Sequence, residues 1–293
     1  MNETWSEAGM NGQLVTNHRG GYRLQRGRHV FSVALLLGVL FFGGLLMPLV
    51  ASAAVSVLQA FPAAGAAPQM TGTTGNMSGT YTVSAGSNRL LVVTVQCYDS
   101  AGSSGQTFTA SYGGQALTQA FVENSNRRQT WIGYLNEAGI AAAGNTTLTV
   151  TITGAHTGVS AFVGTFAGVD QTTPLTAADG AYTNNANNTH VTTGTATAQT
   201  IAVNAGGYAL YNWSGSQART SDTEAYAEHG DVASGGVTVG VAEKAFAAGG
   251  TTDPIVTWAA NTRGSHCIVT LNPALGNTTT VGNGTNPGNA TLA

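Results

Sequence analysis

The stretch that most constrains this chain is residues 88–98, Asn-Arg-Leu-Leu-Val-Val-Thr-Val-Gln-Cys-Tyr. Three valines and a threonine crowd together there between two turn-forming segments, and β-branched residues in this arrangement favour a strand over a helix. Both alternating sets of residues are largely apolar, whereas a strand with one solvated face alternates apolar with polar residues. The sequence therefore predicts a central β-strand that is covered on both faces, against which later strands pair and pack.

The first fifty residues differ in kind from the rest. Residues 1–29 end in a basic segment, residues 30–50 form an apolar run, and a small-x-small tripeptide ends at Ala53. This order is typical of a secretory signal peptide. An apolar run of roughly 20 residues is also long enough to remain as a membrane anchor. We predict cleavage after residue 53, because Pro48 and the small residues favour it, and a secreted or cell-surface protein.

The composition limits the partners of the exported part. Beyond residue 53 the chain keeps six basic and eleven acidic side chains, a net charge of about −5. No basic patch is available to neutralise a phosphate backbone, so nucleic acid is disfavoured. Charged residues make up 8% of the whole chain, against about 25% in ordinary globular proteins. Threonine, serine, asparagine and glycine must supply the polar surface, as in many extracellular β-proteins.

Residues 54–275 consist of short β-type segments separated by turn residues, and residues 276–293 form a linker of Asn, Thr and Gly. No segment has the apolar spacing of a capped helix, although residues 137–143 allow one turn. Gly113 and Gly114 give the strongest hairpin signal. This pattern predicts one all-β domain, an antiparallel β-sandwich or jelly roll. The expected strands are residues 54–61, 80–84, 88–98, 107–112, 115–122, 129–135, 146–153, 159–169, 190–197, 207–213, 223–228, 237–246, 254–260 and 266–271, with residues 170–188 as a surface connection.

Several short motifs mark strand starts, a glycine turn and a core tryptophan. They are residues 88–93, residues 112–114 with Leu117 and Thr118, Trp131 with Leu135, and residues 168–171 with Pro174. Together they resemble uncharacterised exported bacterial jelly-roll modules of surface proteins, which are concanavalin-like in shape. The resemblance implies a fold and brings no catalytic residues. The tail, residues 281–289, resembles the opening of a further module.

One acidic group allows a catalytic hypothesis. Asp222, Glu224 and Glu228 are spaced by even numbers of residues, so they would share one face of a strand. Glycosidases of jelly-roll type use paired carboxylates on a concave sheet, one as acid and one as nucleophile. The simpler interpretation is a solvated edge strand whose charges block pairing with other sheets. The carboxylate spacing also differs from that of such enzymes.

Two further groups allow a ligand site. Asp170 with Asn185 and Asn187 offers the oxygen ligands that calcium prefers, although such residues also cap turns with their own side chains. Aromatic residues in strands more often lie in the core. Trp213 ends its expected strand beside a Ser-Gly pair, so among the tryptophans it is the better candidate for an exposed platform for a sugar ring.

The chain has two cysteines, Cys97 and Cys267. Each shares a parity with apolar residues of its expected strand, so both are predicted to lie in the core. Export permits a disulfide between them, and we expect one if the Cα atoms lie within about 7 Å.

These observations favour a non-enzymatic extracellular module with a structural or adhesive role. The alternative is a carbohydrate-binding, lectin-like module that uses Trp213, Asp222, Glu224 and Glu228, with Ca²⁺ as an optional cofactor. A third hypothesis is a glycoside hydrolase or lyase built on the acidic strand. The expected partners are glycans or other copies of surface proteins, with membrane contact only through the signal segment, and no obligatory cofactor is expected.

Overall fold

The structure is a computed structural model, and it describes residues 53–63, 70–72, 75–100, 105–125, 127–183, 189–190, 201–215, 219–221, 224–234, 237–254, 256–258 and 264–275. All of them belong to the unit that spans residues 50–293. The predicted signal segment before residue 53 and the predicted linker after residue 275 lie outside the described residues. Among the described residues, no helix is long and apolar enough to cross a membrane.

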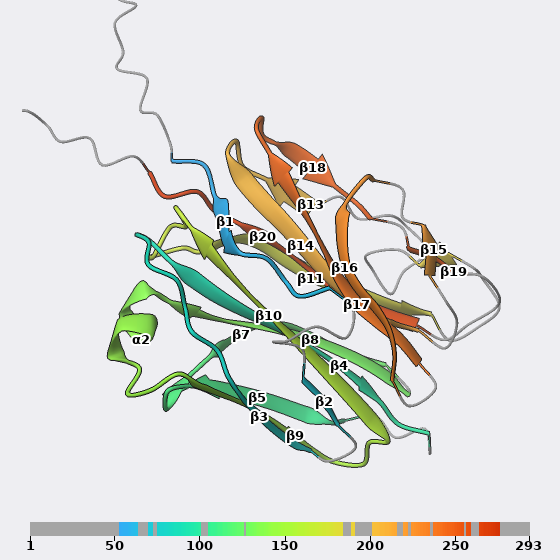
Figure 1. The fold of residues 1–293 in the computed structure, drawn as a ribbon. Coiled ribbons are helices and arrows are strands. Elements are labelled where there is room, and N and C mark those ends of the chain that lie inside the picture. The colour runs from blue at the N-terminus through green and yellow to red at the C-terminus, as the bar shows by residue number, and fades with distance from the viewer. Residues whose placement is uncertain are drawn as a thin grey trace, which may run out of the picture. The chain divides into compact units, whose positions relative to one another are not determined.

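Antiparallel strands make up most of this unit (Figure 1). The first ten are β1 (Ser56–Gln59), β2 (Met70–Gly72), β3 (Asn76–Thr80), β4 (Leu90–Tyr98), β5 (Thr107–Tyr112), β6 (Gln115–Ala116), β7 (Thr118–Ser125), β8 (Arg128–Asn136), β9 (Thr147–Thr153) and β10 (Gly158–Ala167), with the short helix α2 (Glu137–Ala142) after β8. The others are β11 (Leu175–Thr183), β12 (Thr189–His190), β13 (Ile201–Val203), β14 (Gly207–Gly215), β15 (Arg219–Ser221), β16 (Ala227–Ser234), β17 (Val237–Phe246), β18 (Gly250–Thr252), β19 (Val256–Trp258) and β20 (Gly264–Leu271).

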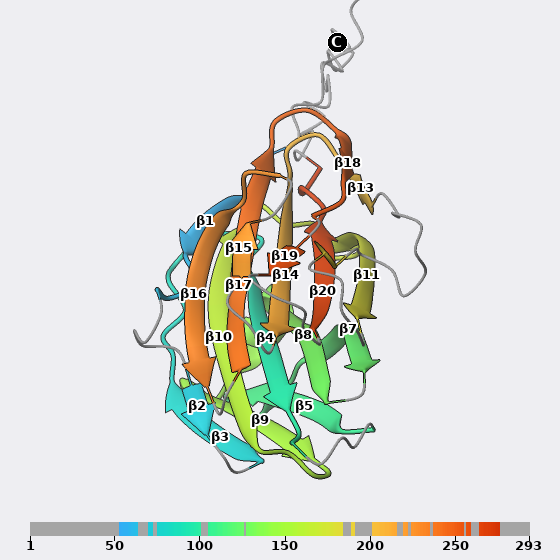
Figure 2. The same cartoon turned by 90° about the vertical axis from the view of Figure 1, so that its right-hand side faces the viewer.

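The strands form stacked layers, seen from two sides in Figures 1 and 2. Sheet S1 has the strand order β3-β9-β5-β6, and sheet S2 has the order β1-β10-β4-β8-β7, with β2 also paired to β10. Sheet S3 has the order β11-β20-β14-β17-β16. Beyond S3 lie sheet S4, with the order β12-β19-β15, and the β13-β18 ribbon. The fold is thus all-β, with antiparallel sheets packed against one another as in a β-sandwich.

The central strand predicted from residues 88–98 is confirmed as β4, in the middle of S2. Leu90 to Cys97 are all buried. Leu91, Val93 and their odd-numbered neighbours enter the core between S1 and S2, whereas Leu90 and Val92 enter the core between S2 and S3. An apolar sequence on both parities therefore corresponds to a strand with a core on each side.

Three apolar clusters hold the layers together. The S1–S2 core contains Trp131, Leu148, Val150 and Ile152 besides the β4 residues. The S2–S3 core is built on Phe162 and Phe166 from S2 and on Leu210, Val241 and Leu271 from S3, among others. A third cluster, on the outer face of S3, includes Tyr211, Trp213, Tyr226 and Ile268.

The hairpin predicted at Gly113 and Gly114 is confirmed between β5 and β6. Tyr112 pairs with Gln115 across a two-residue turn. The glycines have φ values of 55° and 86°, and two consecutive positive values are what a tight turn of this type requires. The following segment, expected as one strand, is divided at Leu117 into β6 and β7.

The prediction that residues 170–188 form a surface connection is wrong for its middle part, because β11 pairs along β20. The strand was hidden by its small residues, Leu-Thr-Ala-Ala-Asp-Gly-Ala. At Gly180 the packing leaves no room for a side chain, because a Cβ would lie 2.5 Å from Cε1 of Phe121 and 2.9 Å from the His266 carbonyl oxygen.

Other segments also differ from the sequence prediction, and strands β13, β15 and β18 form where no strand was expected. Residues 81–84 are not a strand, because β3 ends at Thr80. The loop expected over residues 62–75 contains the short strand β2. The strand expected at residues 223–228 begins only at Ala227.

The segments that lead into and out of this unit lie beside each other at one end. The Ala53 amide donates to the Ala274 carbonyl at 3.2 Å, and the Val55 amide donates to the Gly206 carbonyl at 2.8 Å. The connection between β10 and β11 passes the same place, where Val169 forms an antiparallel bridge with Pro273. Three parts of the chain that are far apart in sequence therefore meet at this end.

Candidate functional site

Both cysteines are buried, as predicted, but the predicted disulfide is wrong because both are free. Cys97 faces the S1–S2 core and Cys267 faces the S2–S3 core, so they lie on opposite sides of S2. The Cys267 Sγ atom lies instead 3.1 Å from the Thr130 hydroxyl. Burial raises the pKa of both thiols, that of Cys97 to about 12. Neither is a reactive nucleophile, since the thiolate is the reactive form.

Trp213 does not form the exposed sugar platform expected from its position near a loop. Its side chain is fully buried, because β14 is the middle strand of S3 and all nine of its residues are buried. The indole packs against Tyr211 with ring centroids 5.4 Å apart. Gly240 is its neighbour on β17, and a glycine there leaves room for the large ring.

The acidic strand face predicted from Asp222, Glu224 and Glu228 is not formed. Asp222 lies outside the described residues, and Glu224 precedes β16 rather than lying on it. Glu228 is exposed on β16, the edge strand of S3, while the intervening Tyr226 is buried. Residues of one strand face would share one environment, so this difference removes the paired-carboxylate geometry for Glu224 and Glu228.

The Glu224 carboxylate is held by donors from other segments. It accepts hydrogen bonds from the Thr252 hydroxyl and the Asp253 amide, each at 2.6 Å, and forms an ion pair with Lys244 at 3.2 Å. Burial alone would raise the pKa of Glu224, but these donors outweigh it and the pKa is lowered. A general acid needs a raised pKa, so Glu224 is suited to a structural ion pair.

Asp170 caps a turn with its own side chain, which was the alternative to a calcium ligand. Its Oδ1 atom accepts from the Thr172 amide at 2.7 Å and from the Thr173 amide at 2.8 Å. Asn185 and Asn187, the other proposed calcium ligands, lie outside the described residues. Within the described part of the chain, no group of three or more His, Cys, Asp or Glu side chains is arranged to hold a metal ion.

A polar cleft of about 450 Å³ opens where the three chain segments meet. Asn272 organises its wall, because its amide donates to the Thr173 carbonyl at 2.8 Å and accepts from the Asn204 amide at 2.5 Å. Amide and carboxylate groups around an open cleft can hydrogen-bond a small neutral polar ligand. Its lining residues are Asp170, Thr173, Asn204, Ala205, Asn272, Pro273 and Leu275.

Two pairs of titratable side chains at the margins of the S2–S3 interface were not identified from the sequence. Glu243 is 5% exposed, and its Oε1 atom lies 2.9 Å from Nε2 of His229. At the opposite margin, burial and the charge of Asp179 raise the pKa of Glu123 to about 7. Burial, with the charge of Asp253, also raises the pKa of Asp179. These groups come from strands distant in sequence, so no local motif indicates them.

Another regular surface feature of the described residues is an uncharged sheet face. Alternate residues of β3, β9 and β5 point into the S1–S2 core, and the residues between them point away from it. We call this outer set the hydroxyl face. Its members are Asn76, Ser78, Thr80, Thr107, Thr109, Ser111, Thr147, Thr149, Thr151 and Thr153, all exposed or half-buried.

The strand register places the side chains of the hydroxyl face in rows. Ser78 pairs with Thr149, and Thr149 pairs in turn with Ser111. The next row is formed by Asn76, Thr151 and Thr109. Neighbouring strands in a sheet lie about 4.8 Å apart, so hydroxyl groups repeat at short intervals across the face.

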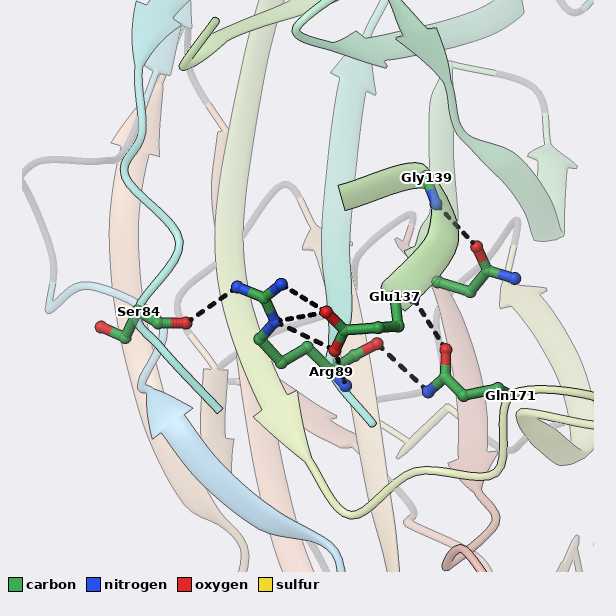
Figure 3. A network of polar contacts seen from close by, with 6 residues as sticks. Ser84, Arg89, Glu137, Gly139 and Gln171 are labelled. Carbon is green, nitrogen blue, oxygen red and sulfur yellow. Dashed lines mark hydrogen bonds and ion pairs between the residues drawn. The ribbon is translucent and has the colours of Figure 1, made fainter. Parts of the chain in front are cut away.

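The motif residues near Arg89 form a structural junction, shown in Figure 3. Nε of Arg89 donates to both carboxylate oxygens of Glu137 at 3.0 Å, and the Arg89 amide donates to Glu137 at 2.8 Å. Gln171 joins both, accepting from the Glu137 amide at 2.7 Å and donating to the Arg89 carbonyl at 3.2 Å. The hydrogen bond to Arg89 lowers the pKa of Glu137. This junction fixes the start of β4 against α2 and the segment after β10.

Comparison with protein-family models, with curated proteins and with solved structures found no match. No comparison therefore adds support to the resemblance between the short motifs and jelly-roll modules.

Proposed function

We propose that the protein is a non-enzymatic extracellular or cell-surface β-sandwich module with a structural or adhesive role. The observation that carries the proposal is the hydroxyl face, an uncharged array of hydroxyl side chains on the outer layer of the unit. Such a face can exchange hydrogen bonds with a neutral, hydroxyl-bearing surface without the cost of removing charges from water.

Two of the described carboxylates are held in structural ion pairs, which fits a role without catalysis. Glu137 is bound by Arg89 and Glu224 is bound by Lys244, and the pKa of each is lowered. A carboxylate held in this way stays ionised and stabilises the fold. Within this proposal, the sheets take a concanavalin-like jelly-roll arrangement, and the signal segment directs export.

A carbohydrate-binding role is the alternative, and the polar cleft at Asn272 favours it. The cleft offers amide and carboxylate oxygens to the hydroxyl groups of a sugar. The third candidate, a glycoside hydrolase or lyase that uses Asp222, Glu224 and Glu228, has less support because the pKa of Glu224 is lowered.

The adhesive role is tested with beads that carry the exported full chain. Their detachment force is measured on a film of neutral polysaccharide and on a layer of the same protein. We expect the double variant Ser78→Lys/Thr109→Lys to reduce the force several-fold, because it places two charges on the hydroxyl face. Both positions are exposed, so stability should change by only about 0.5 kcal/mol.

The matched control is Thr118→Lys/Thr251→Lys, which adds the same charge at exposed positions of β7 and β18. Equal loss of adhesion in both double variants would contradict a specific role of the hydroxyl face. A glycan array separates the alternative: binding that is lost in Asn272→Ala and kept in Ser78→Lys/Thr109→Lys would favour the lectin-like role. Polysaccharide cleavage that Glu224→Gln abolishes would establish the hydrolase.

A further inference from the structure

The sheets divide the described residues into two halves, and no strand ladder among these residues joins one half to the other. Strands β1 to β10 form S1 and S2, and strands β11 to β20 form S3, S4 and the β13-β18 ribbon. We call residues 53–169 half 1 and residues 174–275 half 2. In an ordinary sandwich of one unit, strands from both ends of the chain commonly mix within a sheet. Their separation here shows that each half completes its own sheets.

The two halves have the same strand order. S2 reads β1-β10-β4-β8-β7, and S3 reads β11-β20-β14-β17-β16. Each of these five strands of S2 has a counterpart at the same place in S3 and in the same chain order, whereas β2 has none. The path β3-β9-β5 of S1 corresponds in the same way to β12-β19-β15 of S4. Eight strands of half 1 thus have counterparts in half 2.

The strand registers agree in detail at the first strand of each half. Val57 pairs with Phe166 and Gln59 with Thr165, so one residue of β1 bulges between them. In half 2, Leu175 pairs with Leu271 and Ala177 with Thr270, with one residue of β11 bulging in the same way. A β-bulge is a specific local feature that is retained within protein families, so its recurrence at equivalent positions indicates equivalent strands.

The last hairpin of each sheet repeats as well. Strands β7 and β16 are each eight residues long, and each carries one register shift. β7 ends at Ser125 and β8 begins at Arg128, while β16 ends at Ser234 and β17 begins at Val237. Strand length and turn length therefore coincide in two hairpins that differ in sequence, and each hairpin has one register shift, although at a different position.

The halves pack with the relationship of a symmetric dimer. Each of the two sheets has a core on both faces. S2 covers the S1–S2 core with one face, S3 covers the third cluster with one face, and their remaining faces pack against each other in the S2–S3 core. Several contacts occur in matching pairs: β8 contacts β20 and β10 contacts β17, while β8 contacts β14 and β17 contacts β4. The contact of β7 with β11 has no comparable counterpart between β16 and β1. The arrangement therefore approximates a two-fold interface, in which each contact has a counterpart with the roles exchanged. Figure 2 shows the strands of both sheets running in nearly the same direction.

Specific polar contacts fix the centre of this interface. Asn212 donates to the Val95 carbonyl at 3.3 Å and to the Trp131 carbonyl at 3.1 Å. Gln96 donates to the Gly240 carbonyl at 3.3 Å. Both side chains are almost completely buried. A buried amide that is paired across an interface disfavours alternative registers, because another register leaves it unsatisfied.

We infer that half 1 and half 2 are two copies of one folding unit, and that the S2–S3 surface is a dimer-type interface. Each half then recognises the complementary half of a second copy of this chain as well as its own. The duplication is not visible in the amino-acid sequence, because different residues at different positions fill the core of each half. Trp131 fills the S1–S2 core from β8, whereas Trp213 fills the corresponding cluster of half 2 from β14.

The test uses the full chain with a protease site inserted between Thr172 and Thr173, in the connection between the halves. Both residues are exposed. Isotopically heavy and light samples are cleaved, denatured, mixed and refolded by dilution. We expect β-sheet circular dichroism to return, and native mass spectrometry to show heavy–light hybrids of the two halves in statistical proportion.

The control carries the same site between Gly144 and Asn145, two exposed residues inside half 1. Cleavage there separates β9 and β10 from the strands with which they pair, so we expect no refolding. The inference is overturned if the halves fail to reassemble while the uncleaved chain with the insertion refolds. It is also overturned if both cleaved proteins reassemble equally well.

Discussion

The protonation of Glu123 makes stability depend on pH in a direction that can be measured. Glu123 lies opposite Thr130 on β8, and Thr130 contacts Cys267 of S3, so the carboxyl faces the S2–S3 interface. Burial, with the charge of Asp179 on β11, raises the pKa of Glu123 from 4.5 to about 7. The folded state therefore holds a proton that the unfolded state releases between these two pKa values.

The sign follows from proton linkage. Because the folded pKa is raised, the free energy of unfolding falls as pH rises from about 4.5 to about 7. Each pKa unit corresponds to about 1.4 kcal/mol, which gives an upper bound of about 3 kcal/mol. Solvent screening of this partly exposed group reduces the effect to about 1–2 kcal/mol. Glu123→Gln should thus raise the free energy of unfolding by about 1–2 kcal/mol at pH 8 and leave it nearly unchanged at pH 4.

The assay is urea denaturation of the full chain and the variant at both pH values. The difference between the two proteins cancels the titration of the groups that do not interact with Glu123, whereas Asp179, which does interact with it, remains part of the measured effect. Glu228→Gln is the matched control, because Glu228 is exposed on the edge strand of the other half, and it should change stability by about 0.5 kcal/mol or less. The reasoning would be refuted if Glu123→Gln raised the free energy of unfolding equally at pH 4 and pH 8, or lowered it at pH 8.

Three other outcomes are expected. Thiol labelling should modify Cys97 and Cys267 only on unfolding, without a reductant, and the absence of labelling at both thiols in denaturant would restore the disulfide. Trp213→Ala should lower the free energy of unfolding by about 3–5 kcal/mol, as for a fully buried aromatic residue, in thermal or urea melts; a loss under 1 kcal/mol would contradict its burial. Intact-mass analysis of the exported protein should show Ala54 as its first residue, and a product that keeps residues 30–50 would make that segment an anchor.

The sequence was informative where burial and secondary structure leave the same pattern. β4 was predictable because both of its faces are buried, and β9 because threonines alternate with Leu148, Val150 and Ile152. β11 was not predictable, since its small residues are set by contacts such as that between Gly180 and Phe121. The pattern of a single strand shows only its own periodicity. The contact between Gly180 and Phe121 depends on a different sheet, so the pattern does not reveal it.

The candidate sites were harder to predict for the same reason. Parity showed that Cys97 and Cys267 point into apolar surroundings, but it does not say which of two cores each one enters. Trp213 was placed near a loop by sequence, yet the whole of β14 is covered. The hydroxyl face combines three strands, so it becomes visible only when the register of β3, β9 and β5 is known.

The meeting of Ala53 and Ala274 at one end has a mechanical consequence. A force applied through the two flanking segments acts on neighbouring points and draws them apart. The hydrogen bonds from Ala53 to Ala274 and from Val55 to Gly206 are then loaded one after another, as in the opening of a zipper, and not all at once as in the sliding of long strands. The terminal segments should peel away at low force, while the sheets behind them remain folded and take up load only after the slack has been released.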